Sequence, residues 1–294
     1  MAPTPMSAPN DPRAAQFRER VRREWDDPLT VAAWRKWSRS SANMLGGVTR
    51  AIVEAAGASP GHAILDLASG FGQPALALAA VVGSDGSVTA TDQSAGMLGV
   101  VEENARRENL MNLRIEQADA EALPFPDATF DGVTCRFGAM FFPEPLRAMR
   151  ECLRVLRPGG RAAFVVWGSP EQPFFGMTAG VLRRFVAFPE PEPGAPHVFR
   201  FAAPGSLAQV MRNAGFRPAS EEPRRIPCER VGTPESFWEE FREVAAPFRA
   251  MIAALPPERR AELDREVLAA MQPYATGDRL QFHAEINLAC GTRP

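Results

Sequence analysis

Two glycines follow a short apolar run, at a place where a strand would turn into a helix. Gly70 and Gly72 come directly after residues 63–68, an apolar run typical of a buried strand. Glycine has no Cβ atom, so the backbone can turn sharply there and approach a ligand closely, although a tight structural turn would need the same residues. Asp92, twenty positions after Gly72, adds a carboxylate that can accept hydrogen bonds from both ribose hydroxyls. Together these residues predict a site for a ribose-containing cofactor.

The acidic residues around this loop distinguish between two cofactors. The spacing of residues 70–75, Gly-x-Gly-x-x-Ala, also satisfies the dinucleotide fingerprint, so an NAD(P)-dependent oxidoreductase is an alternative. Asp66 lies inside the first predicted strand, however, and Asp119 follows the third. An acid at each of the first three strand ends suits a cofactor with ammonium, ribose and adenine groups, whereas a pyrophosphate gains nothing from Asp66. This pattern favours S-adenosylmethionine.

Five sequence blocks, in order along the chain, carry a family resemblance. Residues 64–72, Ile-Leu-Asp-Leu-Ala-Ser-Gly-Phe-Gly, resemble the first signature of class I methyltransferases. The other four blocks, residues 90–98, 118–125, 130–133 and 155–160, resemble the successive motifs of the ubiquinone and menaquinone biosynthesis type, also called methyltransferase type 11. A lone glycine loop would be weak support, but five ordered blocks over residues 62–167 are specific.

The resemblance implies a set of contacts to S-adenosyl-L-methionine. Asp66, Ala68, Gly70 and Gly72 would line the methionine and ribose side, Asp92 would hold the ribose, Gln93 and Met97 would flank the adenine, and Asp119 and Ala120 would contact its edge. Cys135 and Arg136 would lie near the sulfonium and the substrate. The family usually has Gly-Cys or Gly-Gly where this chain has Ala68-Ser69. Because both residues are small, we expect cofactor binding to survive.

The chemistry asks little of the enzyme, because a sulfonium methyl group is already activated. The protein must align a nucleophile behind that group and exclude water, without a metal. A hydroxyl or carbon acid would also need a general base. Glu171, just after the strand predicted at 162–167, and His197, in an irregular segment, are the candidates, although both also fit solvated surface positions. A cofactor-binding protein without catalysis therefore stays open.

The acceptor would meet apolar side chains at the same edge of the sheet. The candidates are Trp34, Trp37, Arg136, Phe137, Met140 and Trp167. Core packing would account for each aromatic residue alone, but ligand pockets are mostly apolar with a few polar anchors. We expect a small apolar or aromatic metabolite, from secondary metabolism or quinone-like biosynthesis.

Helical and strand patterns alternate in a way that would position these residues. Strands are predicted at 63–68, 87–91, 113–117, 130–134, 162–167, 217–226 and 280–290, with helices at 74–82, 95–108, 145–156, 174–188 and 204–214. Strands separated by helices of this length indicate a parallel sheet. We predict an α/β, Rossmann-like, doubly wound, seven-stranded and mostly parallel sheet with an antiparallel last strand.

The same patterns divide the chain. We expect a disordered tail at 1–12, an N-terminal helical lid at 13–58, and a methyltransferase domain at 59–294 with a two-helix insertion at about 233–275. A formal net charge of -2 gives no basic footprint for nucleic acid, and no apolar run approaches the roughly 20 residues that span a bilayer. We therefore expect a cytoplasmic enzyme acting on a small molecule, with no nucleic-acid or membrane partner, and a homo-oligomer stays open.

Overall fold

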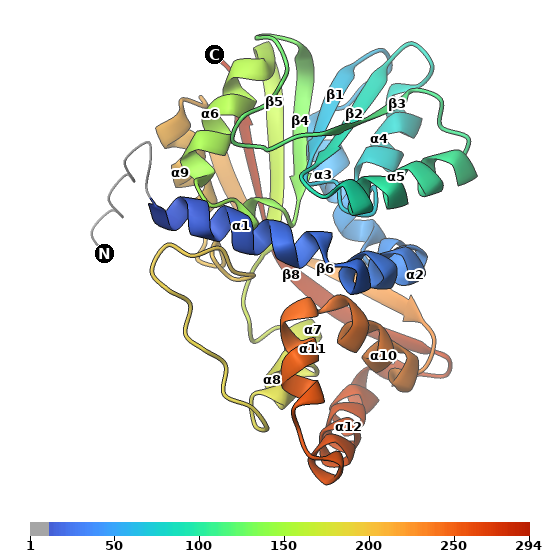
Figure 1. The fold of residues 1–294 in the computed structure, drawn as a ribbon. Helices are drawn as coiled ribbons and strands as arrows, with labels where there is room; N and C mark the ends of the chain where they lie inside the picture. Colours follow the sequence, from blue (N-terminus) through green and yellow to red (C-terminus); the bar gives the residue numbers. More distant parts are fainter. Residues whose placement is uncertain (1–11) are drawn as a thin grey trace.

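The computed structural model describes residues 12–294 and places a mixed sheet at the centre of the molecule (Figure 1). Its strands run in the order β3-β2-β1-β4-β5-β8-β6, and the short β7 pairs with β8. The strands are β1 (Ala63–Leu67), β2 (Ser87–Asp92), β3 (Leu113–Gln117), β4 (Phe130–Arg136), β5 (Leu156–Trp167), β6 (Ala219–Val231), β7 (Ala275–Thr276) and β8 (Arg279–Thr292). β1 to β5 pair in parallel, whereas β8 is antiparallel to both β5 and β6. The predicted α/β fold with an antiparallel last strand is confirmed.

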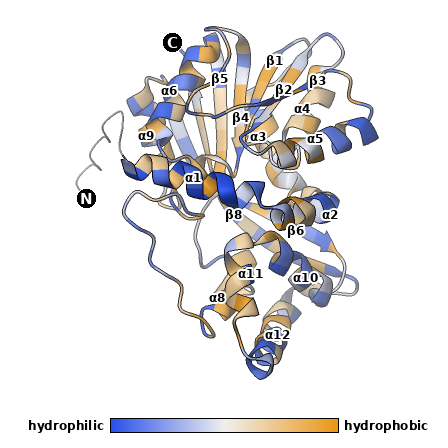
Figure 2. Cartoon of the chain, in the orientation of Figure 1, coloured by the Kyte–Doolittle hydropathy of each residue, from blue (hydrophilic) through white to orange (hydrophobic). Residues whose placement is uncertain are grey.

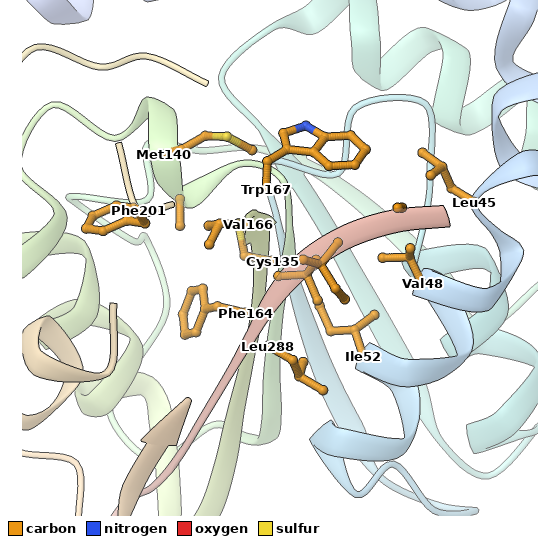
Figure 3. Close-up of a cluster of buried hydrophobic side chains, with 14 of the residues drawn as sticks. Leu45, Val48, Ile52, Cys135, Met140, Phe164, Val166, Trp167, Phe201 and Leu288 are labelled. Carbon is orange, nitrogen blue, oxygen red and sulfur yellow. The ribbon is translucent and has the colours of Figure 1, made fainter. Parts of the chain in front are cut away.

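Helices before and between the strands pack against the sheet. α3 (Gly46–Ala56) contacts β4 and β5, and α4 (Ala75–Val82) and α5 (Ala95–Arg107) contact β2 and β3. α6 (Pro145–Val155) and α9 (Ser206–Ala214) contact each other and the strands on the β5 side. Figure 3 shows part of the resulting core, where Cys135, Phe164 and Leu288 lie among other buried apolar side chains. Each strand is therefore held in place by its neighbouring strands and by the helices that pack on the sheet.

The predicted N-terminal helical stretch is three helices, α1 (Pro12–Asp26), α2 (Pro28–Met44) and α3. The break between α1 and α2 has a local cause, because the Asp27 side chain accepts hydrogen bonds from the N–H groups of Leu29 and Thr30, and Pro28 begins the new helix. Hydrophobic and hydrophilic residues alternate along α1 in Figure 2, as in a helix with one face on the protein. The tail predicted at 1–12 lies outside the described residues, except for Pro12.

The second helical region differs from the prediction. Three helices, α10 (Pro234–Val244), α11 (Ala246–Ala253) and α12 (Pro257–Met271), lie between β6 and β8, where we expected two. Prolines near the start of each helix explain the extra break, since proline fits the first turn and disrupts a helix interior. The helix expected at 174–188 is likewise two short helices, α7 (Pro173–Gly176) and α8 (Ala179–Leu182).

The run 157–160, expected to end a helix before a strand at 162, instead belongs to β5, which begins at Leu156. The pairing register between β4 and β5 shifts between Phe130 and Gly132, so the glycines of this run are taken up by an irregular stretch of the sheet. Within residues 12–294, no helix combines the length and apolar character needed to cross a bilayer.

Candidate active site

The loop after β1 is held in a conformation that its glycines permit. Ala68, Gly70 and Gly72 all have positive φ, at 50°, 55° and 105°. The φ of Gly72 favours glycine, and a Cβ atom there would also make a tight contact of 3.0 Å with the Leu76 side chain. At Ala68 the left-handed conformation costs roughly 1–2 kcal/mol. The sequence thus accepts strain in order to shape this turn.

Asp92 fastens this loop to the end of β2. Its carboxylate accepts hydrogen bonds from the N–H of Gly70 at 2.9 Å and from the N–H of Ser94 at 2.9 Å. The residue is only 8% exposed, and burial raises the pKa of its carboxyl group. Ser94 in turn caps α5 and donates its hydroxyl to the carbonyl of Trp25 in α1. One carboxylate therefore organises the glycine loop, the start of α5 and the approach of α1.

A cavity of about 310 Å³ opens over the carboxyl ends of β1, β2 and β4, a size found for small-molecule sites. It brings together most of the residues predicted from the sequence: Trp34, Ala68, Gly70, Asp92, Gln93, Met97, Asp119, Ala120, Arg136, Phe137, Met140 and Trp167. The strand order places β1 beside both β2 and β4, which is the switch point where open α/β sheets bind ligands.

Three predicted cofactor residues do not line this cavity. Asp66 is fully buried beneath the loop, where Thr134 Oγ1 donates to its Oδ1 at 2.6 Å and its Oδ2 has no donor. This burial raises the pKa of Asp66 to about 6. Cys135 lies in the apolar core shown in Figure 3, and burial raises the pKa of its thiol. Gly72 shapes the turn from behind the cavity wall.

Three further predicted residues also lie away from the cavity wall. Trp37 donates its indole N–H to Glu243 of α10 at 2.6 Å and packs between helices. Glu171 is exposed and hydrogen-bonded to the Ser169 hydroxyl, which lowers the pKa of its carboxyl group. His197 is half-buried, and desolvation lowers the pKa of its imidazole. The structure does not bring these two candidate bases to the cavity, although Val198 beside His197 does line it.

Helix α1 also lines this cavity, through residues that the prediction of an N-terminal lid did not single out. Arg18, Val21, Glu24 and Trp25 line it from one face of the helix, at helical spacing. Arg18 holds the helix in place, because its guanidinium donates to the buried Glu121 at 2.6 and 2.8 Å and also pairs with Glu144. The signal in the sequence was the apolar spacing of Phe17, Val21 and Trp25, with the charged Arg18 and Glu24 beside them.

Aromatic rings continue from α1 to the glycine loop. Trp25 stacks on Trp34 with centroids 6.3 Å apart, and Trp34 stacks on Phe71 at 5.3 Å. Phe141 meets Trp25 edge-on at 5.8 Å. These contacts place α1 and α2 over the loop, so the N-terminal helices cover the end of the cavity lined by Ala68, Gly70, Asp92, Met97 and Asp119, which we call the cofactor end after the sequence prediction.

The aromatic end of the cavity lies toward β5 and the helical insertion, and sequence reasoning found only part of it. It consists of Trp167, Phe174, Phe175, Phe237, Phe241 and Phe248. Trp167 stacks on Phe137 at 4.1 Å and on Phe174 at 5.3 Å. Because β5 is separated from β2 by β1 and β4 in the sheet, this end lies away from Asp92.

Four acidic residues line the cavity, and their surroundings differ. Asp92 accepts backbone amides, Asp119 accepts the N–H of Glu121, and Glu240 is paired with Arg230 at 3.0 Å and accepts the hydroxyls of two serines. Among these four, Glu24 alone has no hydrogen-bond or ion-pair partner within the described chain, and burial raises the pKa of its carboxyl group.

Comparison with known proteins agrees with this geometry. Residues 65–164 match a family model described as a methyltransferase domain. The chain is 33% identical over 199 residues to the demethylmenaquinone methyltransferase of Deinococcus radiodurans, covering 64% of this chain and 77% of that protein. The chain belongs to the class I S-adenosylmethionine-dependent methyltransferases.

Other relatives of this methyltransferase family match parts of the chain. The ubiquinone/menaquinone biosynthesis C-methyltransferase UbiE of Shewanella sediminis is 41% identical over 147 residues, covering 50% of this chain and 54% of UbiE. The chain thus spans about half the length of such curated relatives. The crystal structure of the YcgJ protein from Bacillus subtilis shares the fold, with a TM-score of 0.54 at 19% identity, covering 83% of this chain and 97% of that one.

The cofactor end has the chemistry that S-adenosylmethionine requires. The ribose hydroxyls and the adenine amino group are donors, and Asp92 and Asp119 offer carboxylate oxygens on the cavity wall. Gly70 leaves open space, since a Cβ atom there would meet only the Met97 methyl at 3.9 Å. The residues present therefore fit the cofactor. Within residues 12–294, no group of three or more His, Cys, Asp or Glu side chains could hold a metal ion.

Proposed function

We propose that this protein transfers a methyl group from S-adenosylmethionine to an oxygen, nitrogen or carbon atom of a small apolar or aromatic molecule. The observation that carries the proposal is one cavity whose wall runs from the glycine loop and Asp92 to a cluster of aromatic rings. The cofactor end would hold S-adenosylmethionine, and the aromatic end would hold the acceptor. Secondary metabolism or quinone-like biosynthesis is the setting that such an acceptor suggests.

In this proposal the protein aligns the cofactor with the acceptor and keeps water out of the site. When bound, the cofactor supplies an electrophilic methyl group on a sulfonium. Gly70 and Asp92 would fix the cofactor, and the rings of Trp167 and Phe174 would orient a flat acceptor for in-line displacement. The ion pair of Arg18 with Glu121 and the stacked rings of Trp25, Trp34 and Phe71 would hold α1 and α2 over the site and help to exclude water. In this proposal α1 and α2 act as the lid predicted for residues 13–58.

Glu24 would take the proton of an acidic acceptor. Its carboxyl group lines the cavity, has no competing donor, and has a raised pKa, which brings a carboxylate closer to the range useful for general base catalysis at neutral pH. Arg20 and Arg249 lie near enough to favour its ionised form. A neutral amine acceptor would need this group only after transfer.

Calorimetric titration with S-adenosylmethionine, S-adenosylhomocysteine and NADH tests the proposal. We expect micromolar binding of the two sulfur ligands and none of NADH, because the acids Asp66 and Asp119 suit a cofactor with ammonium, ribose and adenine groups, whereas a pyrophosphate gains nothing from Asp66. A panel of phenols, amines and carbon acids would then be assayed for formation of S-adenosylhomocysteine. Binding of NADH alone would support an oxidoreductase, and cofactor binding without turnover on any acceptor would support a non-catalytic protein.

A further inference from the structure

Arg136, at the end of β4, is a buried cation that the protein leaves unpaired. Its side chain lines the cavity and the residue is only 7% exposed. Nη1 donates to Thr49 Oγ1 at 3.1 Å, Nε is buried without an acceptor, and no carboxylate within residues 12–294 forms an ion pair with the guanidinium. The rings of Phe71 and Phe137 lie 5.3 and 5.8 Å from its central carbon. They attract the charge but accept none of its N–H groups.

A second buried arginine shows how this chain pairs such a group when its role is structural. Arg230 is 3% exposed and donates from Nε to Glu240 at 3.0 Å. Its Nη1 donates to Ser236 Oγ at 2.9 Å and to the carbonyl of Val231 at 3.0 Å. Arg136 has one of these three kinds of partner, a hydroxyl, although it is buried to a similar extent. The difference sets Arg136 apart as a group whose partner is not part of the fold.

The surroundings of Arg136 do not remove its charge. Burial lowers the pKa of the guanidinium to about 10, so the group is still protonated at neutral pH. Asp66 attracts it from beneath the loop but forms no hydrogen bond with it, and the carboxyl of Asp66 is itself buried with a raised pKa. A buried charge without a partner is costly, and it persists where a ligand completes it.

We propose that Arg136 is an anion-binding group of the cavity, which pairs with a carboxylate or another ionised oxygen of a bound ligand. Guanidinium suits this task because it binds carboxylate oxygens with two parallel hydrogen bonds. The inference rests on the proposed function, which offers two sources of this chemistry. One is the methionyl carboxylate of the cofactor, and the other is an acidic group on the acceptor.

Binding measurements with three variants test this assignment. Arg136→Met removes the charge at similar volume, and Arg136→Lys keeps the charge but loses the paired N–H donors of the guanidinium. Arg230→Met is the matched control. Each is titrated with S-adenosylhomocysteine and with 5′-methylthioadenosine, which lacks the amino-acid moiety. Benzoate and benzyl alcohol are then titrated with and without S-adenosylhomocysteine, so that an acidic acceptor is tested by a carboxylate and its neutral counterpart.

The expected results separate the two sources. A methionyl carboxylate predicts that Arg136→Met weakens S-adenosylhomocysteine roughly 10- to 100-fold while methylthioadenosine changes little, with Arg136→Lys in between. An acidic acceptor predicts unchanged nucleoside binding and a wild-type preference for benzoate over benzyl alcohol that Arg136→Met abolishes. In both cases Arg136→Met melts at or above the wild-type temperature, whereas Arg230→Met melts lower because it strands Glu240.

Two results would overturn parts of this picture independently. If Arg136→Met binds every ligand as the wild type does, or melts as low as Arg230→Met with no selective loss of the charged ligands, the anion-binding role is wrong. If the wild type binds no S-adenosylhomocysteine, the proposed function fails, and the benzoate titration without nucleoside still decides whether Arg136 recognises an anion.

Discussion

The two ends of the cavity are built in different ways. The cofactor end is made by backbone, with the positive φ angles of the glycine loop and the amides of Gly70 and Ser94 converging on Asp92. The aromatic end is made by side chains that come from β5, α7, α10 and α11, segments spread over more than 80 residues from Trp167 to Phe248. A backbone site fixes one ligand shape, whereas a wall of side chains can be changed residue by residue. The first suits a shared cofactor and the second a variable acceptor.

The largest effect is expected at the cofactor end. Asp92→Ala removes the acceptor of the Gly70 and Ser94 amides, which orders the loop. It also removes the acceptors that would bind the ribose hydroxyls, where a hydrogen bond to a charged group is worth about 1.5–3 kcal/mol. Affinity for S-adenosylhomocysteine should fall at least about 100-fold in calorimetry. Asp85→Ala, an exposed acid in the turn before β2, is the control and should bind normally. Unchanged affinity in Asp92→Ala would remove Asp92 from the site.

Between the two ends, Glu24 should affect turnover without affecting the cofactor. Glu24→Gln is isosteric and removes the proton acceptor, so kcat should fall about 100-fold for an acidic acceptor while S-adenosylmethionine affinity is unchanged. Because Glu24 acts when ionised and its pKa is raised, the wild-type rate should climb with pH through that pKa, and the variant should lack this limb. A pH profile with the same limb in both proteins would exclude Glu24 as the base.

A substitution of Asp66 tests whether the buried carboxyl group beneath the glycine loop lowers the free energy of unfolding. Its pKa, about 6 in the folded protein, exceeds the ordinary 3.8, so the protonated form is favoured by folding and stability is lost as pH rises from about 4 through 6. A shift of this size is worth up to about 3 kcal/mol at pH 7. Asp66→Asn should therefore unfold at a higher urea concentration than the wild type at pH 7, and the difference between the two midpoints should shrink at pH 4. An equal difference at both pH values would assign the effect to packing.

The residues of the cofactor end could be predicted from the sequence better than those of the aromatic end, because only the former have fixed positions relative to the strands. Gly70 and Asp92 occupy fixed positions after consecutive strands, and parallel strands bring those positions to one edge. Cys135 and Arg136 are neighbours whose side chains alternate across β4, so one enters the core and the other the cavity, which chain position alone could not assign. The residues of α10 and α11 that face the cavity depend on how distant helices pack, and no local pattern carries that information.

Two tryptophans on α2 sharpen the boundary between the cavity and its supports. Trp34 lines the cavity and stacks on Phe71, whereas Trp37 bonds to Glu243 of α10 on the outside. Trp34→Ala should weaken S-adenosylhomocysteine about tenfold, since a stacked aromatic pair contributes about 0.5–1.5 kcal/mol beyond its buried area. Trp37→Ala should lower the melting temperature but leave affinity within about threefold. Equal losses of affinity would mean that α2 as a whole, and not only the face that carries Trp34, supports the bound cofactor.

The smallest effect is expected where position along the chain looked most favourable for catalysis. Glu171 follows β5 at the substrate edge of the sheet, yet it is exposed, and a neighbouring hydroxyl holds its pKa low, so it is a weak base outside the cavity. His197 is half-buried and likewise does not reach the cavity wall. Glu171→Gln and His197→Asn should each change kcat/KM by less than about twofold, equivalent to about 0.4 kcal/mol. The assay is run beside Glu24→Gln on the same acceptor, because the contrast between carboxylates inside and outside the cavity is the quantity of interest. A tenfold loss of kcat/KM in Glu171→Gln would mean that the segment after β5 closes over the acceptor. The aromatic end would then change conformation during the reaction.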